Sequence, residues 1–525
     1  MKAIKQFMLK PWLYIAIVVV GVSLKLYRID YRLFWYDEIA TVLHTSGNQT
    51  FDIPVNEIEN ISYYNDQLHL KKQDQSIGSQ LKGLYSSTNL NPLHYSFLMI
   101  WYRIAGDKDI SYRLFNLFIF ILTLPVLFLL AKTLFKSNLV GWIAVSLYAV
   151  SPYFHFWVHQ ARYNILWVFL IVLCHYLFLQ AISHKKLKWW IGYSLLGILS
   201  LYASVLSGLV IFGHFIFIML FKKDIRVTYS VILLAILSCY LPWIISMISN
   251  SEEITGALAW HSWFGQNSLI LLLYQFFGLT RIFSIFSNYQ SLYYLYFTGN
   301  YIQQITDILI LVIIISSIVY TIKKAPREVA YFLILIFLPY ILFLFISDIV
   351  RDTGGSIFWR YHAINFIVVI LFAAYFISRK IALGKLVYSG IYMGLIIMGL
   401  ISIFIISKTS RCDSPNCYDR INKAQFFSNA RNPLLITDFA MVSGQKGDIG
   451  FMVIMNECQS DNVDVLRASS DIKDVEKMLL DAKYSDIYVT DASSELVENL
   501  KSQFGKKMDS LKVEGISPMW QIILD

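Results

Sequence analysis

The sequence predicts a polytopic α-helical membrane protein with about eleven transmembrane helices, an interfacial helix in the first outer loop, and a small C-terminal α/β soluble domain. Hydrophobic residues make up 57% of the 525 residues and charged residues only 15%, whereas a soluble domain carries about a quarter charged residues. Long apolar segments recur up to residue 407, and a more polar stretch follows. The net charge of +9 does not require nucleic acid as a partner, because Lys and Arg collect in the cytoplasmic loops of membrane proteins.

Apolar segments that match the thickness of a bilayer define the expected helices. Crossing the hydrocarbon core takes roughly 17–25 residues per helix. The candidate spans are residues 11–28, 110–130, 139–154, 163–182, 188–205, 206–221, 227–248, 304–322, 329–348, 361–378 and 385–407. The stretch 188–221 is nearly continuous, and small residues around Gly208 indicate where the chain reverses.

The charges of the connecting loops predict the orientation of these segments. Every second loop is short and basic, namely residues 132–136, 184–188, 222–226, 323–327 and 379–385. Basic loops stay on the cytoplasmic side, so we expect the N-terminus there as well. The remaining regions are then extracytoplasmic, and the large ones are residues 29–109, 249–303, 349–360 and 408–525.

Residues 91–105 are apolar but short, and they decide the topology. Counting them as a span would move every later loop to the other side of the membrane. We therefore predict a helix along the outer interface, where Trp101, Tyr102 and Arg103 find both apolar and polar surroundings. A short true span is the alternative, and the loop charges argue against it.

The chain is expected to divide into a transmembrane domain, residues 1–407, and an extracytoplasmic α/β domain, residues 408–525. In the second domain, apolar strands at 434–436 and 487–489 alternate with helical patterns at 471–483 and 493–504. Cys412 and Cys417 could form a disulfide there if the compartment is oxidising. A metal site fits these two thiols less well, because no second pair of Cys or His lies nearby.

Adjacent carboxylates mark the first outer loop as a candidate site. Asp37 and Glu38 follow the first span among aromatic residues. Carboxylates near the membrane surface are suited to proton transfer. A solvated loop start is the simpler alternative for the same two residues.

Two arginines stand at the outer ends of predicted spans. Arg162 begins the helix after the third span, and Arg360 precedes the tenth. A guanidinium at the membrane surface can hold a lipid phosphate through two parallel hydrogen bonds, and an interfacial anchor is the alternative. His155 and His159 could share one helical face nearby, but two histidines are too few to specify zinc.

Four short motifs in this order resemble those of the GT-C glycosyltransferases, which include protein O-mannosyltransferases and the aminoarabinose transferases that modify lipid A. The motifs are Asp37-Glu38, then Asn91-Pro92-Leu93-His94-Tyr95, then Ser151-Pro152 through Gln160-Ala161-Arg162-Tyr163, and finally Arg360-Tyr361. The resemblance covers roughly residues 10–380. It implies a polyprenyl-phosphate sugar as donor and a lipid, glycan or protein as acceptor, with membrane lipids as the surroundings.

The resemblance and the chemistry together suggest a role for each candidate residue. Asp37 is expected to be the catalytic base, and Arg162 and Arg360 are expected to bind the donor phosphate. The residues expected to orient the acceptor or the base are Glu38, His94, His159, Gln160, Tyr163 and Tyr361.

Two departures from the family pattern bear on acids and metals. Many bacterial relatives have a glutamate where this chain has Gln160, so a second acid is missing. The aminoarabinose transferases carry an acid just before the proline, where this chain has Leu90 and Asn91. No cofactor is certain on these grounds: a divalent metal is possible, but the ligand spacing does not support one.

These observations predict an inverting glycosyltransferase in the inner membrane of a bacterium, with its active site on the outer face. The richness in Ile, Lys, Phe and Tyr is typical of an AT-rich bacterial genome. The rival classes are a multi-span transporter or lipid flippase, a polymerase or ligase that uses diphosphate-linked donors, and an assembly protein. A transporter would place ionisable residues within its spans, and the predicted spans are nearly free of charge.

Overall fold

The computed structural model divides the chain into two compact units. It describes residues 6–46, 48, 52–68, 78, 92–106, 108–252, 255, 261–262, 267–286, 301–409, 417–438, 456, 462–480 and 484–523. The membrane unit comprises Met1–Tyr31, Thr88–Phe97 and Ile110–Ser410. The sheet unit comprises Arg32–Ser87, Leu98–Asp109 and Arg411–Asp525.

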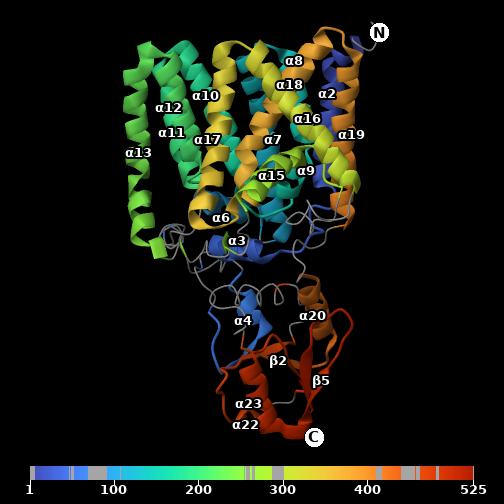
Figure 1. Ribbon diagram of the computed structural model, residues 1–525. Helices are drawn as coiled ribbons and strands as arrows, with labels where there is room; N and C mark the ends of the chain where they lie inside the picture. Colours follow the sequence, from blue (N-terminus) through green and yellow to red (C-terminus); the bar gives the residue numbers. More distant parts are fainter. Residues whose placement is uncertain are drawn as a thin grey trace. The chain divides into compact units, whose positions relative to one another are not determined.

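Helices of the membrane unit stand where the sequence predicts spans (Figure 1). They are α2 (Pro11–Leu26), α7 (Asp109–Phe135), α8 (Asn138–Ala149), α9 (Pro152–Val158), α10 (Asn164–His184), α11 (Leu187–Ala203), α12 (Ser207–Phe221), α13 (Arg226–Ser249), α16 (Tyr301–Lys324), α17 (Arg327–Arg351), α18 (Ala363–Ala382) and α19 (Leu386–Thr409). Among the described helices, seven are long and apolar enough to cross a membrane, and the bent pair α8 and α9 gives an eighth if it forms one span. The predicted polytopic helical architecture is confirmed.

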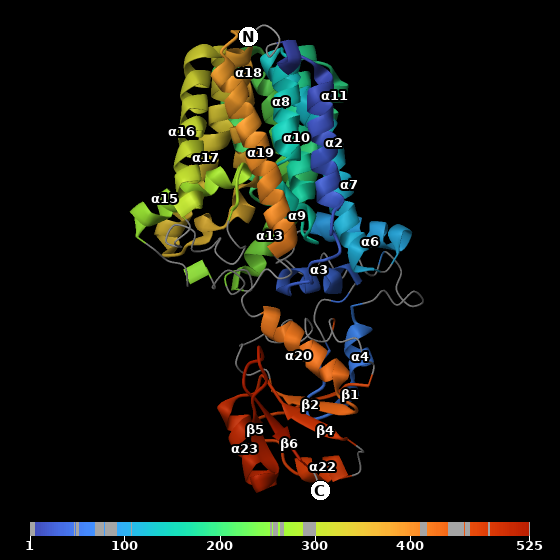
Figure 2. The same ribbon diagram turned by 90° about the vertical axis from the view of Figure 1, so that its right-hand side faces the viewer.

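Successive helices run in opposite directions, so alternate connections lie at the same end of the bundle. The connections after α7, α10, α12, α16 and α18 lie at the end where the N-terminus is drawn (Figures 1 and 2). These connections contain the basic loops of the sequence. The bundle therefore has one basic end, in agreement with a uniform orientation of the helices.

A serine–proline pair separates α8 from α9 and turns the chain. The oxygen of the Ser151 side chain accepts a hydrogen bond from the backbone N–H of Phe154 at 3.4 Å, and Pro152 occupies the first turn of α9. Both residues are favoured at a helix start, since serine caps an unpaired N–H and proline has none to lose. The two helices consequently meet at a bend of 56°.

Small residues allow three helices to pack closely near that bend. A Cβ added to Gly21 of α2 would lie 2.6 Å from the carbonyl oxygen of Ala149. A Cβ added to Gly399 of α19 would lie 2.5 Å from the carbonyl oxygen of Val150. Glycines permit such close backbone contact between membrane helices, so α2 and α19 hold the end of α8 from two sides.

The described part of residues 249–303 contains a helix that the sequence did not predict. Here α15 (Ser268–Gly278) continues into the 3-10 turn η3 (Leu279–Ile282), and both belong to the membrane unit. The segment is apolar but shorter than a full span. It packs against α16 and α17 within the unit (Figure 1), so part of the predicted outer loop belongs to the helical bundle.

The predicted helix at 91–105 is also present, as α6 (Pro92–Ala105). It is too short to count among the candidate spans. Its amino-terminal residues belong to the membrane unit. The location of α6 at an outer interface stays a prediction.

The sheet unit contains a six-stranded sheet of mixed direction (Figure 2). The strands are β1 (Ile58–Asn60), β2 (Pro433–Thr437), β3 (Asp464–Arg467), β4 (Asp486–Val489), β5 (Met508–Leu511) and β6 (Met519–Ile522), in the spatial order β1-β3-β2-β4-β6-β5. Strands β3, β2 and β4 are parallel, and the others join them antiparallel. The unit also contains α3 (Tyr36–Ser46), α4 (Ile61–Asn65), α20 (Cys417–Asn429), α22 (Val475–Leu480) and α23 (Ser494–Phe504). The predicted α/β character of this region is confirmed.

The edge strand β1 comes from the first outer loop. Ile58 pairs with Leu466 of β3, and the Asn60 side chain donates to the Asp464 carboxylate at 2.8 Å. The sheet therefore includes a segment that the sequence assigned to the transmembrane domain, while the expected boundary at residue 407 stays a prediction. Cys412 lies outside the described residues, and the side chain of Cys417 is not described.

Candidate active site

The turn between α9 and α10 presents Arg162 at one end of the membrane unit. The side-chain amide of Asn116 in α7 donates hydrogen bonds to the carbonyl oxygens of Trp157, Gln160 and Arg162. Asn116 is fully buried, so its amide fixes the backbone of this turn from inside the bundle. Arg162 itself is half-buried.

Arg360 is held against the same helix start. Its carbonyl oxygen accepts a hydrogen bond from the side-chain amide of Asn164, at 3.2 Å. Asn164 is the first residue of α10 and follows Arg162 closely in the chain. The neighbouring carbonyl of Trp359 accepts from the hydroxyl of Tyr153 in α9, at 3.1 Å. Two buried side chains thus attach the Arg360 segment to the Arg162 turn.

Arg162 and Arg360 both lie close to tyrosines of this region. The guanidinium carbon of Arg162 is 5.8 Å from the centre of the Tyr163 ring, and that of Arg360 is 5.1 Å from the centre of the Tyr361 ring. The hydrogen bond from Asn164 to the Arg360 carbonyl holds the two segments together. The structure therefore places the Arg360 segment beside the Arg162 turn, which the sequence alone could not show.

His94 lies close to Arg162. Burial and, to a smaller extent, the charge of Arg162 lower the pKa of His94 from its ordinary value of 6.5 to about 3, while a backbone hydrogen bond to Ala161 opposes the shift. The imidazole is therefore neutral at physiological pH and adds no positive charge beside Arg162.

The buried state of His94 predicts an acid-sensitive stability. Between pH 6.5 and 3 the unfolded chain binds a proton at this position that the folded protein does not bind. The free energy of unfolding should fall as the pH is lowered through this window, by up to about 1.4 kcal/mol per pH unit. Thermal unfolding of wild type and His94→Asn from pH 8 to pH 4 tests this. The substitution should reduce the pH dependence below about pH 6.5 and leave it unchanged above; equal slopes for the two proteins would contradict the assignment.

His159 and Gln160, both predicted as orienting residues, occupy interior positions. A ring nitrogen of His159 lies 2.8 Å from the carbonyl oxygen of Lys25, near the end of α2. The neighbouring His155 lies 3.0 Å from the hydroxyl of Ser407 in α19. The two histidines thus connect α9 to α2 and α19, and the acceptor-orienting role of His159 and Gln160 stays a prediction. Within the described ranges, no three His, Cys, Asp or Glu residues gather as a metal site.

Asp37 and Glu38 lie in the first turn of α3, in the sheet unit. The Glu38 carboxylate accepts the backbone N–H of Trp35 at 3.4 Å, and the Asp37 carbonyl accepts from the Thr41 hydroxyl at 2.9 Å. Negative charge is favourable at a helix start, where backbone N–H groups lack partners. Both acidic residues therefore occupy positions that the start of a helix favours.

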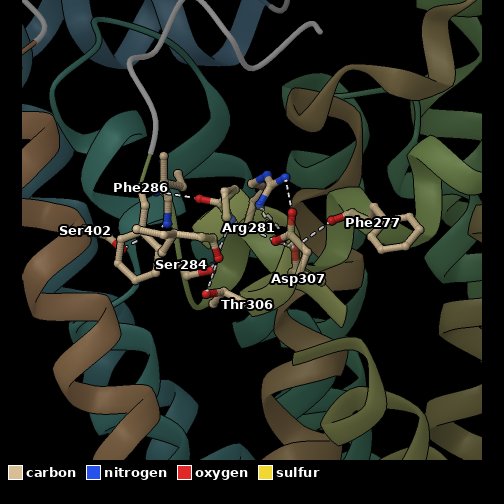
Figure 3. A network of polar contacts seen from close by, with 11 residues as sticks. Phe277, Arg281, Ser284, Phe286, Thr306, Asp307 and Ser402 are labelled. Atoms are coloured by element: carbon tan, nitrogen blue, oxygen red, sulfur yellow. Dashed lines mark hydrogen bonds and ion pairs between the residues drawn. The ribbon is translucent and has the colours of Figure 1, made fainter. Parts of the chain in front are cut away.

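Sequence reasoning missed a buried charge pair in the membrane unit (Figure 3). Two guanidinium nitrogens of Arg281 in η3 contact the two carboxylate oxygens of Asp307 in α16, at 2.5 Å and 2.7 Å. The hydroxyl of Thr280 and the amide of Gln303 also donate to this carboxylate, at 2.6 Å and 2.8 Å. Exposure is only 4% for Arg281 and 6% for Asp307. Since η3 also packs against α9 and α18, the pair helps to attach this segment to the bundle.

A second overlooked residue is Arg113 in α7. It is almost fully buried, and one of its guanidinium nitrogens donates to the carbonyl oxygen of Ile29 at 3.1 Å. This contact fixes the chain just after α2, where the first outer loop begins. Arg113 lies within the predicted apolar span 110–130. A charged residue inside a span is unusual, and this was the signal that could have marked Arg113 as a structural or functional residue.

Comparison with known proteins places the fold among solved structures. The family model for dolichyl-phosphate-mannose-protein mannosyltransferase matches residues 90–245. No curated protein matches significantly in sequence. ArnT from Cupriavidus metallidurans, solved with undecaprenyl phosphate, matches at a TM-score of 0.54 and 10% identity, over 97% of each chain. Its apo state matches at 0.53 and 11% identity, again over 97% of each chain.

A third solved structure extends the comparison. The apo oligosaccharyltransferase of Archaeoglobus fulgidus has a TM-score of 0.50 and 11% identity, and the match covers 91% of this chain and 70% of that one. These likenesses establish the fold, which this chain shares with ArnT and the oligosaccharyltransferase. The resemblance to the GT-C glycosyltransferases carried by the four sequence motifs is confirmed at this level.

Proposed function

We propose that the protein is an inverting glycosyltransferase that moves a sugar from a polyprenyl-phosphate carrier to an envelope acceptor. The observation that carries the proposal is the attachment of the Arg360 segment to the Arg162 turn through Asn164, with the Arg162 guanidinium 5.8 Å from the Tyr163 ring. Two guanidinium groups on adjoining segments can together bind an anion with several oxygens, such as a phosphate ester. That ArnT has been solved with undecaprenyl phosphate supports the same class of ligand.

The location of this pair supports chemistry at the outer membrane surface. Arg162 precedes α10, and α10 ends at the basic loop 184–188. Arg360 precedes α18, which ends at the basic loop 379–385. Both arginines therefore lie at the end of the helices away from the basic loops. By the positive-inside rule this is the extracytoplasmic end.

The proposed reaction is a direct displacement at the anomeric carbon. The acceptor hydroxyl oxygen forms a bond to that carbon while the bond from the carbon to the phosphate oxygen breaks, so the configuration inverts. Asp37 takes the proton of the acceptor hydroxyl, and the polyprenyl phosphate leaves as an anion. A phosphate monoester has a second pKa near 6 and needs no general acid to depart. Arg162 and Arg360 stabilise the charge that develops on it, and no step is assigned to a metal.

A reaction with defined products tests this function against its rivals. The purified protein in lipid vesicles is supplied with polyprenyl-linked sugars extracted from envelope membranes, and the lipids are followed by mass spectrometry. The proposal predicts that free polyprenyl monophosphate accumulates as the sugar appears on an acceptor. Release of polyprenyl diphosphate would favour a polymerase or ligase. Movement of intact carrier between leaflets, with no release, would favour a flippase.

Removal of the Asp37 carboxylate tests the proposed base. Asp37→Asn keeps the size of the side chain but cannot accept a proton, so transfer should slow by about 10²–10⁴-fold. Asp30→Asn, which changes an exposed carboxylate of the same loop, is the matched control and should keep normal activity. A loss of only a few-fold in Asp37→Asn would show that another group, or the acceptor itself, performs this step.

A further inference from the structure

His261 lies next to the proposed phosphate site and has no role in the mechanism above. One of its ring nitrogens, Nε2, is 3.2 Å from the hydroxyl of Tyr361. The two rings meet edge-to-face with their centroids 5.8 Å apart, and the His261 ring also packs near Phe358. The residue is 8% exposed. A buried histidine is thus directed at a tyrosine that follows Arg360 in the chain.

The backbone around His261 holds it in this position. Its carbonyl oxygen accepts the N–H of Gly354 at 3.0 Å. The Asp348 carboxylate at the end of α17 accepts the N–H groups of Gly355 and Ser356 at 2.8 Å and 2.7 Å, and the Thr353 hydroxyl at 2.9 Å. The turn that carries these donors is therefore fixed by one buried carboxylate, and it forms the surface on which His261 rests.

Gly355 leaves the space that the imidazole needs. A Cβ at this position would lie 3.3 Å from an oxygen of Asp348 and 3.4 Å from Nδ1 of His261. A side chain here would press on both groups. The close fit means that the ring has little freedom to turn away from Tyr361.

Tyr361 connects this arrangement to the arginines. The guanidinium carbon of Arg360 lies 5.1 Å from the centre of the Tyr361 ring, a distance at which a cation is attracted to the ring face. The Arg360 carbonyl also accepts a hydrogen bond from Asn164, which begins α10 directly after the Arg162 turn. His261 and Tyr361 therefore belong to the segment that is attached to the Arg162 turn.

We propose that His261 is a positioning residue of the donor-phosphate site, holding the Tyr361 hydroxyl so that its proton is donated to a phosphate oxygen. In this arrangement Nε2–H of His261 donates to the Tyr361 oxygen. The Tyr361 O–H is then directed to the ligand and completes a set of donors with Arg162 and Arg360. A hydroxyl group rotates freely until its oxygen accepts a hydrogen bond, and that bond then fixes the direction in which its proton points. The inference rests on the proposed function and adds one residue to it.

A binding measurement with a defined probe tests the proposal. Radiolabelled undecaprenyl phosphate is bound to the purified full-length protein, to variants that lack the imidazole N–H (His261→Ala and His261→Phe), to Tyr361→Phe and to the double variant. Each single change should weaken binding about tenfold, as expected for one hydrogen bond to a charged group. The double variant should also lose about tenfold and not about a hundredfold, because both changes break one chain of hydrogen bonds.

Further variants separate this inference from the proposed function. His261→Gln should bind almost normally, because its amide N–H can replace Nε2–H, and His184→Ala at the basic end is the matched control. Normal binding by both imidazole-deletion variants, with weak binding by Arg360→Ala, would overturn the role of His261 alone. Independent, multiplying losses in the double variant would also overturn it. Failure of the wild type to bind the probe would remove the proposed function itself.

Discussion

Replacing either Arg162 or Arg360 with alanine should lower the rate of sugar transfer by about 10²–10³-fold, the largest effect expected for any substitution outside the base. Each change removes one of the two guanidinium groups that stabilise charge on the departing phosphate. Lysine at either position should restore part of the activity, because it keeps the charge and loses the planar pair of donors. Arg327→Ala, at the first residue of α17 near the basic end, is the control and should remain active.

The measurement for this prediction is initial rate against donor concentration in lipid vesicles. The arginine variants should show a reduced kcat and a higher KM for the donor. Their KM for the acceptor should be unchanged. The control excludes a general effect of losing surface charge. If Arg162→Ala and Arg360→Ala kept activity within about threefold of wild type, the donor phosphate would have to bind elsewhere in the protein.

Asp307→Leu should destabilise the membrane unit by about 3–5 kcal/mol. The substitution leaves the buried guanidinium of Arg281 without the carboxylate that it contacts through two nitrogens. The donors from Thr280 and Gln303 lose the same acceptor. Unfolding of the purified protein by a graded denaturing detergent provides the measurement, with helix content as the readout.

Two further variants separate burial from charge as the cause. The double variant Arg281→Met with Asp307→Leu removes both charges and should recover most of the lost stability, because no uncompensated charge remains. Glu328→Gln breaks an exposed pair with Lys222, in which the carboxylate side chain is 52% exposed, and should have an effect of about 1 kcal/mol or less. Equal stability of Asp307→Leu and wild type would mean that the pair does not anchor η3.

The positions of the membrane helices could be predicted because hydrophobicity and loop charge act over whole segments. A run of apolar residues has few alternatives to a helix in lipid, and alternate basic loops fix its direction. The spans at 304–322 and 329–348, for example, match α16 and α17 with small differences at the ends. Even the uncertain reversal near Gly208 is real, although it occurs at residues 204–206, before α12 begins.

Features built from distant residues could not be predicted in the same way. Arg281 stood in a predicted outer loop and its partner Asp307 in a predicted span, so neither position suggested an ion pair. Strand β1 has three residues, which is too few to show a hydrophobic alternation in the sequence. It forms because it pairs with the edge of β3. His261 is isolated in the sequence from Tyr361, and only the turn fixed by Asp348 brings them together.

Only part of the candidate site could be predicted, because its residues are also distant from one another in the sequence. The motifs predict Arg162 and Arg360 as phosphate ligands, which stays a prediction, and the fold adds that the Arg360 segment is attached beside the Arg162 turn. The same motifs assigned His159 an orienting role, whereas its contact with the Lys25 carbonyl shows how a motif histidine also serves helix packing. Residue type alone does not distinguish a ligand-binding side chain from one that connects helices.

The most direct test of polyprenyl-phosphate-dependent transfer is mass spectrometry of lipid A, envelope glycans and envelope proteins from three strains. These are the wild type, a deletion, and the deletion complemented with the double variant Arg162→Ala and Arg360→Ala. We predict that one sugar-sized mass is lost from a single acceptor class in both mutant strains, and that the sugar-loaded polyprenyl monophosphate accumulates in them. Unchanged masses in every fraction, with normal expression and donor supply, would contradict the account and favour a transporter.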